Sequence, residues 1–274
     1  MPLVFAAIAP HGGLAVEEWC DPEERDVARL TRRGFEELGR RFDAAKPEVT
    51  VVATPHHVHV EGALAVVIGA ELAGTLDEAF SPVELACPIE LPLAFDVLAA
   101  LGTIAPAVGV GFGSNDPESA TVPMDWGTLI PLWFLGGRHE PPLPAVVLCP
   151  SRDLSLEQHA EAGRALGAAL AASERRVAFV ASADHGHAHD PSGPYGFDPA
   201  AAEFDEVIVA AVREDRLERI LGLDADFIER AKADSPWQLA LLHGVLAGSA
   251  RVELLSYEAP TYFGMLCASY ELAD

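Results

Sequence analysis

The histidines of this chain are gathered at a few positions that look like the ends of strands. Imidazole nitrogens bind Fe, Zn, Cu or Ni, and two imidazoles with one carboxylate leave open positions on the metal for substrate and dioxygen. This clustering predicts a metal centre; a chance gathering of polar residues at strand ends is the alternative. Seven of the ten histidines follow three apolar runs: His11, then His56, His57 and His59, then His185, His187 and His189.

Short apolar runs alternate along the chain with longer amphipathic stretches, which is typical of a mostly parallel sheet covered by helices. We therefore expect an α/β fold, a single domain over residues 1–274 with a mixed, mostly parallel sheet and helices on both faces. In such sheets the loops after the carboxyl ends of parallel strands meet in one crevice, so the three histidine groups are expected to converge. The expected strands are Leu3–Ala9, Val49–Thr54, Leu64–Gly69, Ala107–Phe112, Ala145–Cys149, Val177–Ser182, Arg251–Ser256 and Phe263–Ser269.

The expected helices carry the usual signals at their ends, such as proline in the first turn and a capping side chain before it. Asp21 is expected to cap the first of them. These helices are Pro22–Ala45, Thr128–Leu135, Leu156–Ala172, Pro199–Glu214 and Pro236–Ala247.

The chain has 18 basic and 42 acidic residues, a formal charge of −24. Such a charge repels phosphate backbones and anionic lipid surfaces, so we expect neither nucleic acid nor membrane partners. Four scattered cysteines form no CxxC pair, and the apolar segment Pro2 to Pro10 has no basic residue before it and is too short to span a bilayer. These features predict a reduced, cytoplasmic protein.

Four motifs occur in order along nearly the whole chain: Ala9-Pro10-His11-Gly12-Gly13, Thr54-Pro55-His56-His57, Asp125-Trp126-Gly127-Thr128-Leu129-Ile130-Pro131-Leu132 and Ser182-Ala183-Asp184-His185-Gly186-His187. As an ordered set they resemble the motifs of class III extradiol ring-cleavage dioxygenases, in particular the catalytic subunit of protocatechuate 4,5-dioxygenase-like enzymes. The Memo-like proteins share the same scaffold. The resemblance implies a non-haem Fe(II) enzyme, with Zn, Mn or Cu as alternative metals, that cleaves a catechol or 2-aminophenol-type ring with O2.

The resemblance places the two imidazole metal ligands at His11 and His56. His57 is the alternative to His56, because neighbours on an extended segment point to opposite faces and cannot both reach one ion. His57, with His59 on the same side, is otherwise expected as a substrate-pocket or surface residue. The third family ligand is an acidic residue just before a buried helix, which corresponds here to Asp234.

Asp234 departs from the glutamate that the dioxygenases usually carry, and aspartate is shorter by one methylene. Glu258 is therefore kept as a reserve ligand. The match also makes His187 the catalytic acid–base residue, since a near-neutral imidazole can take a proton from a catechol hydroxyl and return it later. Asp184 is expected to orient that imidazole or its own loop, while His185 and His189 are expected to be solvated loop residues.

Trp126 is the second departure, because the dioxygenases commonly have histidine between the aspartate and the glycine of this motif. Asp125 and Trp126 are expected to border the substrate, with the indole as an aromatic wall. Tyr195, in the Pro- and Gly-rich segment 190–199, is expected to contact substrate from a lid or to be a packed loop residue. The two departures leave open a metal-binding or redox protein of the Memo-like kind, or a non-catalytic subunit. The resemblance also leaves open whether the chain works alone, as a homo-oligomer or with a small accessory subunit.

Overall fold

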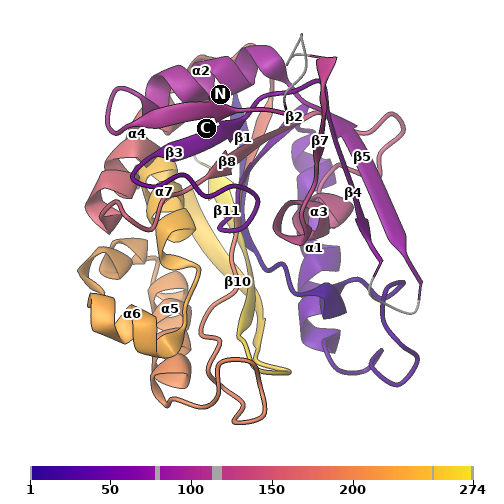
Figure 1. The fold of residues 1–274 in the computed structure, drawn as a ribbon, viewed down its shortest axis with the longest axis vertical. Coiled ribbons are helices and arrows are strands. Elements are labelled where there is room, and N and C mark those ends of the chain that lie inside the picture. Colours follow the sequence, from indigo (N-terminus) through magenta and orange to yellow (C-terminus); the bar gives the residue numbers. More distant parts are fainter. Residues whose placement is uncertain (1, 78–80, 113–118, 249, 273–274) are drawn as a thin grey trace.

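The computed structural model describes residues 2–77, 81–112, 119–248 and 250–272, and its centre is a sheet of eight strands in the order β10-β11-β1-β9-β2-β8-β3-β6 (Figure 1). All eight runs expected from the sequence are strands of this sheet, and their ends differ from the expected ones by three residues at most. The strands are β1 Leu3–Ala9, β2 Val49–Ala53, β3 Leu64–Val67, β6 Ala107–Val110, β8 Ala145–Cys149, β9 Val177–Ser182, β10 Ala250–Glu258 and β11 Met265–Leu272.

The middle of the sheet is parallel: β1 pairs with β9, β9 with β2, and β2 with β8. Every residue of β2, β8 and β9 is buried, as expected for central strands covered on both faces. Four of the seven strand pairs described in this eight-stranded sheet are parallel, and the antiparallel ones include β11 with β1 and with β10. The prediction of an α/β fold with a mixed, mostly parallel sheet is confirmed.

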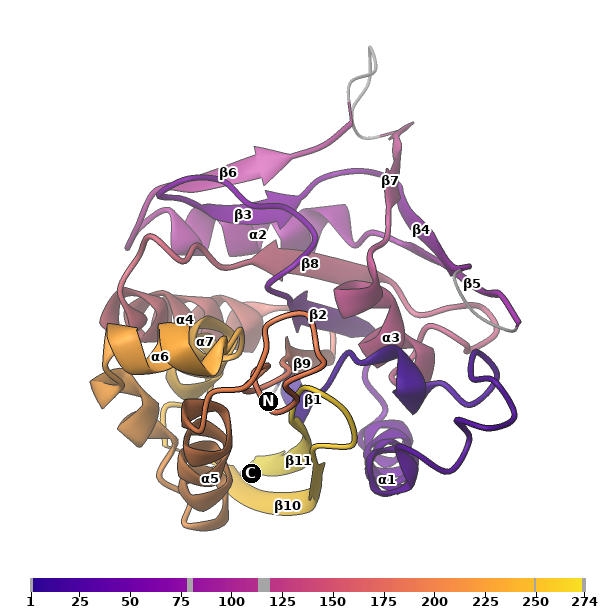
Figure 2. The same cartoon turned by 60° about the horizontal axis from the view of Figure 1, so that its bottom comes forward.

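Helices cover both faces of the sheet (Figure 2). On one side α1 packs against β1, β10 and β11 and touches α3; on the other, α7 packs on β9, α4 packs along α7, and α2 lies over β3, β6 and β8. α5 packs on β10 and α6 on α5. The α-helices are α1 Arg29–Ala45, α2 Leu91–Leu101, α3 Trp126–Phe134, α4 Leu156–Ala172, α5 Ala200–Arg213, α6 Ala225–Ala231 and α7 Pro236–Leu246, with 3-10 turns at Gly13–Ala15 and Leu217–Gly222.

The start of α1 corrects the sequence prediction. The helix begins at Arg29 rather than Pro22, and its N-cap is Ala28, which makes no side-chain cap hydrogen bond, so Asp21 does not cap it. Instead Glu258, on the distant strand β10, accepts from the backbone nitrogen (2.6 Å) and the hydroxyl (2.8 Å) of Thr31 in the first turn. A carboxylate at a helix N-terminus satisfies free N–H groups and complements the helix dipole. Tertiary contact therefore decides where this helix begins.

Several elements were not predicted from the sequence. A second sheet has the order β5-β4-β7, with β4 at Glu71–Leu76, β5 at Val83–Pro88 and β7 at Thr121–Pro123. The helices α2 and α6 were also missed. The four cysteines are free and buried, and no helix of the described residues is long and apolar enough to cross a membrane.

Candidate metal centre

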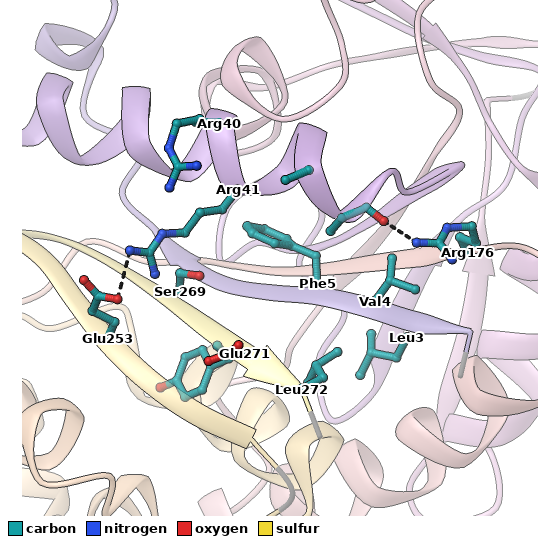
Figure 3. A pocket seen from close by; sticks show the side chains of 13 residues that line it. Leu3, Val4, Phe5, Arg40, Arg41, Arg176, Glu253, Ser269, Glu271 and Leu272 are labelled. Atoms are coloured by element: carbon teal, nitrogen blue, oxygen red, sulfur yellow. Dashed lines mark hydrogen bonds and ion pairs between the residues drawn. The ribbon is translucent and has the colours of Figure 1, made fainter. Parts of the chain in front are cut away.

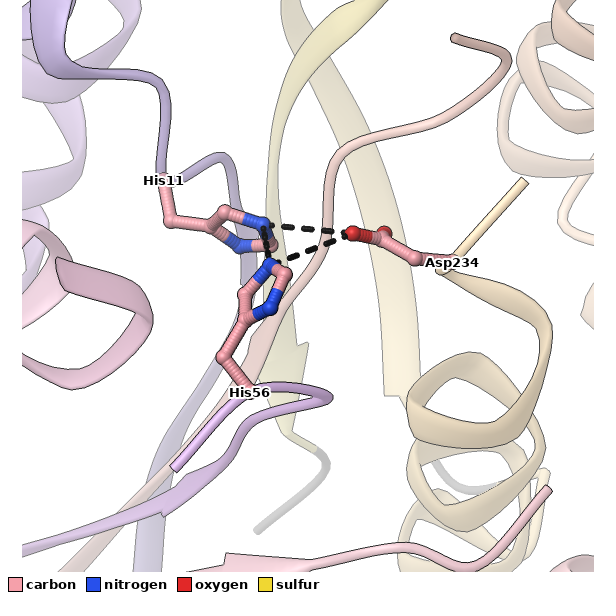
Figure 4. Close-up of side chains that lie close together, drawn as sticks. All are labelled: His11, His56 and Asp234. Carbon is pink, nitrogen blue, oxygen red and sulfur yellow. Dashed lines mark hydrogen bonds and ion pairs between the residues drawn. The ribbon is translucent and has the colours of Figure 1, made fainter. Parts of the chain in front are cut away.

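His11, His56 and Asp234 come together from three separate parts of the chain (Figure 4). His11 follows β1, His56 follows β2, and these strands flank β9, so the carboxyl ends of neighbouring parallel strands supply both imidazoles. Their Nε2 atoms are 3.0 Å apart, and each lies 3.4 Å from Oδ2 of Asp234. The three ligand atoms form a small triangle.

This triangle fits a single metal ion. With metal–nitrogen distances of about 2.1 Å, two nitrogens 3.0 Å apart subtend an angle of roughly 90° at the ion, as adjacent positions of an octahedron do. Two imidazoles and one carboxylate on one face of such an ion leave its other positions open. Oδ1 of Asp234 is buried and has no hydrogen-bond partner among the described residues, so neither oxygen is neutralised by a protein donor other than the histidines. The donor set is suited to Fe(II) or a related divalent metal.

The hydrogen bonds of His11 leave its Nε2 available to bind a metal. Its Nδ1 lies 3.0 Å from Oγ of Ser182, and that hydroxyl is 2.5 Å from the carbonyl oxygen of Gly127. A hydroxyl has one proton, which Ser182 donates to the carbonyl, so the hydroxyl accepts from Nδ1–H of His11. The proton of the neutral imidazole is thus held on Nδ1, and Nε2 presents its lone pair to the site.

The electrostatics of the centre favour a cation. Burial by itself would lower the pKa of His11, but the carboxylates of Asp184 and Asp234 outweigh burial and raise it to about 9. For Asp234 burial opposes ionisation, yet His11 and His56 hold its pKa below the ordinary value. Burial raises the pKa of Asp184, whose Oδ1 accepts from the backbone nitrogen of His11 at 3.1 Å. Positive charge is therefore stabilised where the three ligand atoms meet.

Asp234 is held at the entrance of α7. Pro236 occupies the first turn of that helix, and Lys232, two residues before Asp234, ends α6 in the left-handed conformation. The carboxylate is thus fixed between two helix ends rather than on a free loop. Glu258, the reserve ligand, is instead bonded to Thr31 at the start of α1, so the structure brings Asp234 and not Glu258 to the histidines.

His187 lies beside the same three residues. Its Nδ1 is 2.7 Å from the carbonyl oxygen of His185, so Nδ1 carries the proton and Nε2 is free. Nε2 is 3.9 Å from Oδ2 of Asp234, and the ring stacks on Phe263 with centroids 5.3 Å apart. The backbone nitrogen of His187 donates to the carbonyl of Ala231 at the end of α6. The imidazole is therefore fixed with its basic nitrogen beside the metal ligands.

His185 and His189 correct the sequence prediction of solvated loop residues. His185 is fully buried, with Nδ1 2.9 Å from Oγ of Ser235. His189 bonds through Nε2 to Asp205 (2.9 Å), a buried carboxylate of α5 that also accepts from the backbone of Gly186 and the hydroxyl of Tyr257. These contacts hold the loop that carries His187 on both sides.

Asp125 and Trp126 lie where β7 leads into α3. Asp125 caps α3 by accepting from the backbone nitrogen of Thr128, and its Oδ2 is buried and without a hydrogen-bond partner among the described residues. Trp126 is 49% exposed, with its ring 4.7 Å from that of His56. A Cβ on Gly127 would lie 2.5 Å from Oγ1 of Thr54 and 3.1 Å from the His56 ring, so only glycine allows this approach.

His57 and His59 do not join the centre. Both ring nitrogens of His57 are buried without a hydrogen-bond partner among the described residues, and His57 lines neither of the hollows that open on the metal ligands. His59 is exposed, 3.8 Å from a carboxylate oxygen of Asp153. The expected placement of these two histidines in a substrate pocket remains a prediction.

Two hollows open on the metal ligands, and both are lined by His56, His187 and Tyr195. The larger, of about 480 Å³, also exposes His11, Asp184 and an aromatic set of Trp19, Trp126, Tyr262 and Phe263. The smaller, of about 340 Å³, contains Asp234 and residues of α6 and α7. Tyr195 is 55% exposed at their common rim, with its ring 5.9 Å from that of His187.

A family model described as the catalytic LigB subunit of aromatic ring-opening dioxygenase matches residues 5–265. The chain belongs to this family. The match runs from β1 to the start of β11, so it includes all four motifs and Asp234. The recognition of the class III extradiol family is confirmed, and with it a place in a superfamily of metal-dependent, aromatic ring-opening dioxygenases.

Two relatives of this LigB-family chain are themselves without an assigned activity in their names. Protein CA_C1420 of Clostridium acetobutylicum is 26% identical over 259 residues, which are 92% of this chain and 54% of that protein. The chain thus spans about half the length of this curated relative. The crystal structure of uncharacterized protein JW3007 from Escherichia coli K12 is similar with a TM-score of 0.62 and 22% identity, over 97% of this chain and 99% of that one. That second likeness is one of fold.

Some residues at this LigB-family centre were missed by sequence reasoning. Ser182 was noted only as the start of a motif, although its place at the last position of β9 signals a side chain that can reach its neighbours. Tyr262 and Phe263 line the larger hollow. From the sequence, Phe263 was expected only as the first residue of a strand and Tyr262 as the residue before it. Arg152 lines the smaller hollow from the loop after β8, three residues beyond Cys149, and carries no motif that would single it out.

Proposed function

We propose that this chain is a non-haem Fe(II) extradiol dioxygenase that opens a catechol or 2-aminophenol-type ring with O2, incorporating both oxygen atoms. The observation that carries the proposal is the arrangement of four side chains. Two imidazoles and one carboxylate converge within 4.8 Å, and a fourth group, His187, directs its free Nε2 to the same place. A metal site of this kind with an adjacent base is what ring opening requires.

His11, His56 and Asp234 would hold the iron, and Ser182 would keep His11 in the tautomer that binds it. When bound, the iron would supply a binding site for the ring heteroatoms and O2 and the electron transfer that lets them react. Asp184 accepts a hydrogen bond from the backbone nitrogen of His11 and so holds the backbone of this ligand in place. These residues would bind the iron and orient its ligands.

His187 moves the proton. Nδ1 is committed to the carbonyl of His185, so only Nε2 can accept the proton of a ring hydroxyl. The same nitrogen returns the proton when the ring opens to a semialdehyde product. A positioned imidazole of this type contributes a factor of about 10²–10⁴ to the rate.

Aromatic side chains would hold the ring and exclude water. Trp126 lies against His56, and Phe263 stacks on His187, so the larger hollow offers ring faces on both sides of the metal ligands. Aromatic pairs favour offset or edge-on contacts, which suit a flat catechol. Tyr195, on segment 190–199, borders both hollows at its exposed position and would cover the bound ring.

Anaerobic reconstitution with Fe(II), followed by a panel of catechols and 2-aminophenols, tests the proposal. We expect O2 uptake with a yellow ring-fission product, and His187→Gln should lower kcat by about 10²–10⁴ with less effect on KM. His59→Gln is the matched control, since His59 is exposed and borders neither hollow.

The competing function is a metal-binding or redox protein without ring cleavage, and the specific observation in its favour is Trp126, where the dioxygenases carry histidine. A protein that binds metal through His11, yet consumes no O2 with any member of the panel, would establish that alternative. Equal activity of His187→Gln and the wild type would overturn the role of His187.

A further inference from the structure

The strand β6 forms one edge of the eight-stranded sheet and lies outermost in Figure 2. In the part of the chain that the structure describes, β6 pairs with β3 alone, so no described strand covers its other side. An edge strand is a template for pairing with another chain unless charged side chains, a bulge or a covering element protect it. The side chains around β6 therefore decide whether this edge is protected.

Large apolar side chains are exposed around this edge. They come from α2, from the turn after α2, from β6 itself and from the residue two places beyond β6: Phe95, Ile104, Val108 and Phe112. We call these four residues the β6 patch. They are four of the nine large apolar residues that are exposed in the described part of the chain, so apolar surface is concentrated here. Concentrated apolar surface of this kind marks an interaction site more often than scattered single residues do.

The helix α2 presents Phe95 toward the strand. Leu98, three residues after Phe95, comes within 3.3 Å of the position that a Cβ on Gly109 of β6 would take. Residues three apart on a helix share a face, so Phe95 lies on the face of α2 that borders β6. The helix and the edge strand thus belong to one continuous surface.

This surface carries almost no charge. In the whole segment from Phe95 to Phe112, Asp96 is the only charged residue, although the chain has 42 acidic and 18 basic residues. Charged side chains are a usual means by which proteins prevent an edge strand from pairing with another chain. No such side chain occurs on β6, whose sequence is Ala-Val-Gly-Val.

The opposite edge of the sheet, at β10, is protected. Arg251 and Glu253 occupy exposed positions of β10, Glu253 pairs with Arg41 of α1 at 2.9 Å, and α5 packs on the strand. A hollow of about 590 Å³ beside this edge is lined by several charged side chains (Figure 3): Arg40, Arg41, Arg176, Glu253 and Glu271. The two edges of one sheet thus differ, and β6 is the one without charged protection.

We infer that two copies of this chain associate through the β6 patch, with their β6 strands antiparallel and the two sheets continuous. A two-fold axis normal to the sheet makes such a contact self-complementary, because the same patch serves both copies. Antiparallel pairing brings the end of one strand, with Phe112, to the beginning of the other, near Ile104. The axis also keeps α2 of both copies on the same face of the joined sheet, where the faces that carry Phe95 adjoin.

The charge of the chain favours a second copy at this place. Two chains with a formal charge of −24 each repel one another, and the repulsion is weakest where the facing surfaces carry no charge. A basic partner, by contrast, would be attracted to the acidic surfaces elsewhere and would find no acidic group on β6. Because β6 has only four residues, its hydrogen bonds are few, and the apolar side chains of the patch supply most of the association energy.

Sedimentation equilibrium of the wild type from about 1 to 100 μM tests the inference. We expect a monomer–dimer equilibrium that shifts toward dimer between about 20 mM and 0.5 M NaCl, because salt screens the repulsion between two acidic chains. Val108→Glu should raise the dissociation constant of the dimer at least about tenfold, since it places like charges from both copies in the apolar contact.

Val27→Glu is the matched control. Val27 is 37% exposed against 36% for Val108, but it lies before α1 and outside the patch. Both variants have the same net charge, so a general increase in repulsion affects them equally, and only Val108→Glu should weaken the dimer strongly. Phe95→Glu, at an exposed position of α2, provides a second test in case the change in β6 disturbs folding, which circular dichroism would reveal.

A wild type that stays monomeric at the highest concentration in both salts would overturn the inference. So would a dimer that Val108→Glu and Phe95→Glu weaken no more than Val27→Glu does. A dimer that dissociates as salt rises would also contradict it, because ion pairs across a charged surface would then hold the copies together. None of these measurements involves metal or O2, so they are independent of the proposed function.

Discussion

Ser182 shows how one side chain that never touches the metal can decide whether the site forms. Its hydroxyl donates to Gly127 and accepts from His11, which holds the His11 proton on Nδ1. Without that acceptor the imidazole is free to place its proton on Nε2, where it opposes metal binding. Ser182, at the end of β9, thus controls which ring nitrogen of His11 carries the proton.

We therefore expect Ser182→Ala to weaken Fe(II) or Zn(II) binding by about 10- to 100-fold, the usual effect of removing a partner that orients a ligand histidine. Metal affinity, measured by competition with a chromophoric chelator, is the readout. Ser151→Ala is the control, because Ser151 is also fully buried and hydrogen-bonded but contacts Val60 and Asp153 instead. A loss of metal affinity in both variants would show a general effect of stability rather than of the tautomer.

The residues of the candidate site could be named from the sequence where a motif carried them. His11, His56 and His187 follow strand ends, and Asp234 precedes a proline that begins a helix. Ser182 could not be assigned its role in this way, because that role comes from a neighbour distant in the chain, His11. His185 was expected in solvent for the same reason: its contact with Ser235 spans 50 residues.

At the scale of elements, the main sheet could be predicted and the small one could not. Central strands such as β2 and β9 are buried on both faces and read as continuous apolar runs. By contrast β4 has only one buried residue in six and contains a glycine, and β7 is three residues long. Their strand structure depends on pairing with each other, which no local pattern reveals. The start of α1 is a similar case, because it depends on Glu258 of β10.

The helix pair α4–α7 contains a buried histidine that makes the stability of the fold depend on pH. Helix α7 begins two residues after the metal ligand Asp234. The helices are in close contact, since a Cβ on Gly244 of α7 would lie 2.1 Å from the carbonyl oxygen of Ala160 on α4. His159, the preceding residue, is fully buried, with Nδ1 bonded to the carbonyl of Ser155 and Nε2 without a partner among the described residues. Burial lowers the pKa of His159 to about 4. The imidazole is therefore neutral in the folded protein near pH 7.

Acid should loosen this helix pair. In the unfolded chain the pKa of a histidine is about 6.5, so between roughly pH 6.5 and 4 the unfolded state binds more protons and the free energy of unfolding falls as the pH falls. Full protonation corresponds to a loss of about 3 kcal/mol below pH 4. His159→Leu should remove this part of the pH dependence in urea unfolding series at pH 7, 6, 5 and 4, whereas His59→Gln, at an exposed histidine, should leave it. Parallel curves for His159→Leu and wild type would contradict the prediction.

At the scale of the whole molecule, repulsion among the excess acidic residues lowers the stability of the folded state at low ionic strength. A formal charge of −24 repels itself most strongly in the compact state, and only part of it is relieved by surface ion pairs such as Arg230–Asp198. Exposed pairs of this kind contribute little to stability and are weakened by salt, while screening of the general repulsion acts in the opposite direction. The imbalance of 24 charges makes repulsion the larger of the two effects.

We therefore expect the melting temperature to rise with ionic strength, by roughly 3 °C for each kcal/mol of repulsion relieved. The measurement is calorimetry of the metal-free protein from about 10 mM to 0.5 M salt, where the Debye length falls from about 30 Å to below 10 Å. NaCl, KCl and choline chloride should give the same rise, because screening depends on ionic strength and not on the cation. A fall in melting temperature would show that the surface ion pairs outweigh the repulsion. A rise that depends on the cation would instead indicate specific binding among the carboxylates.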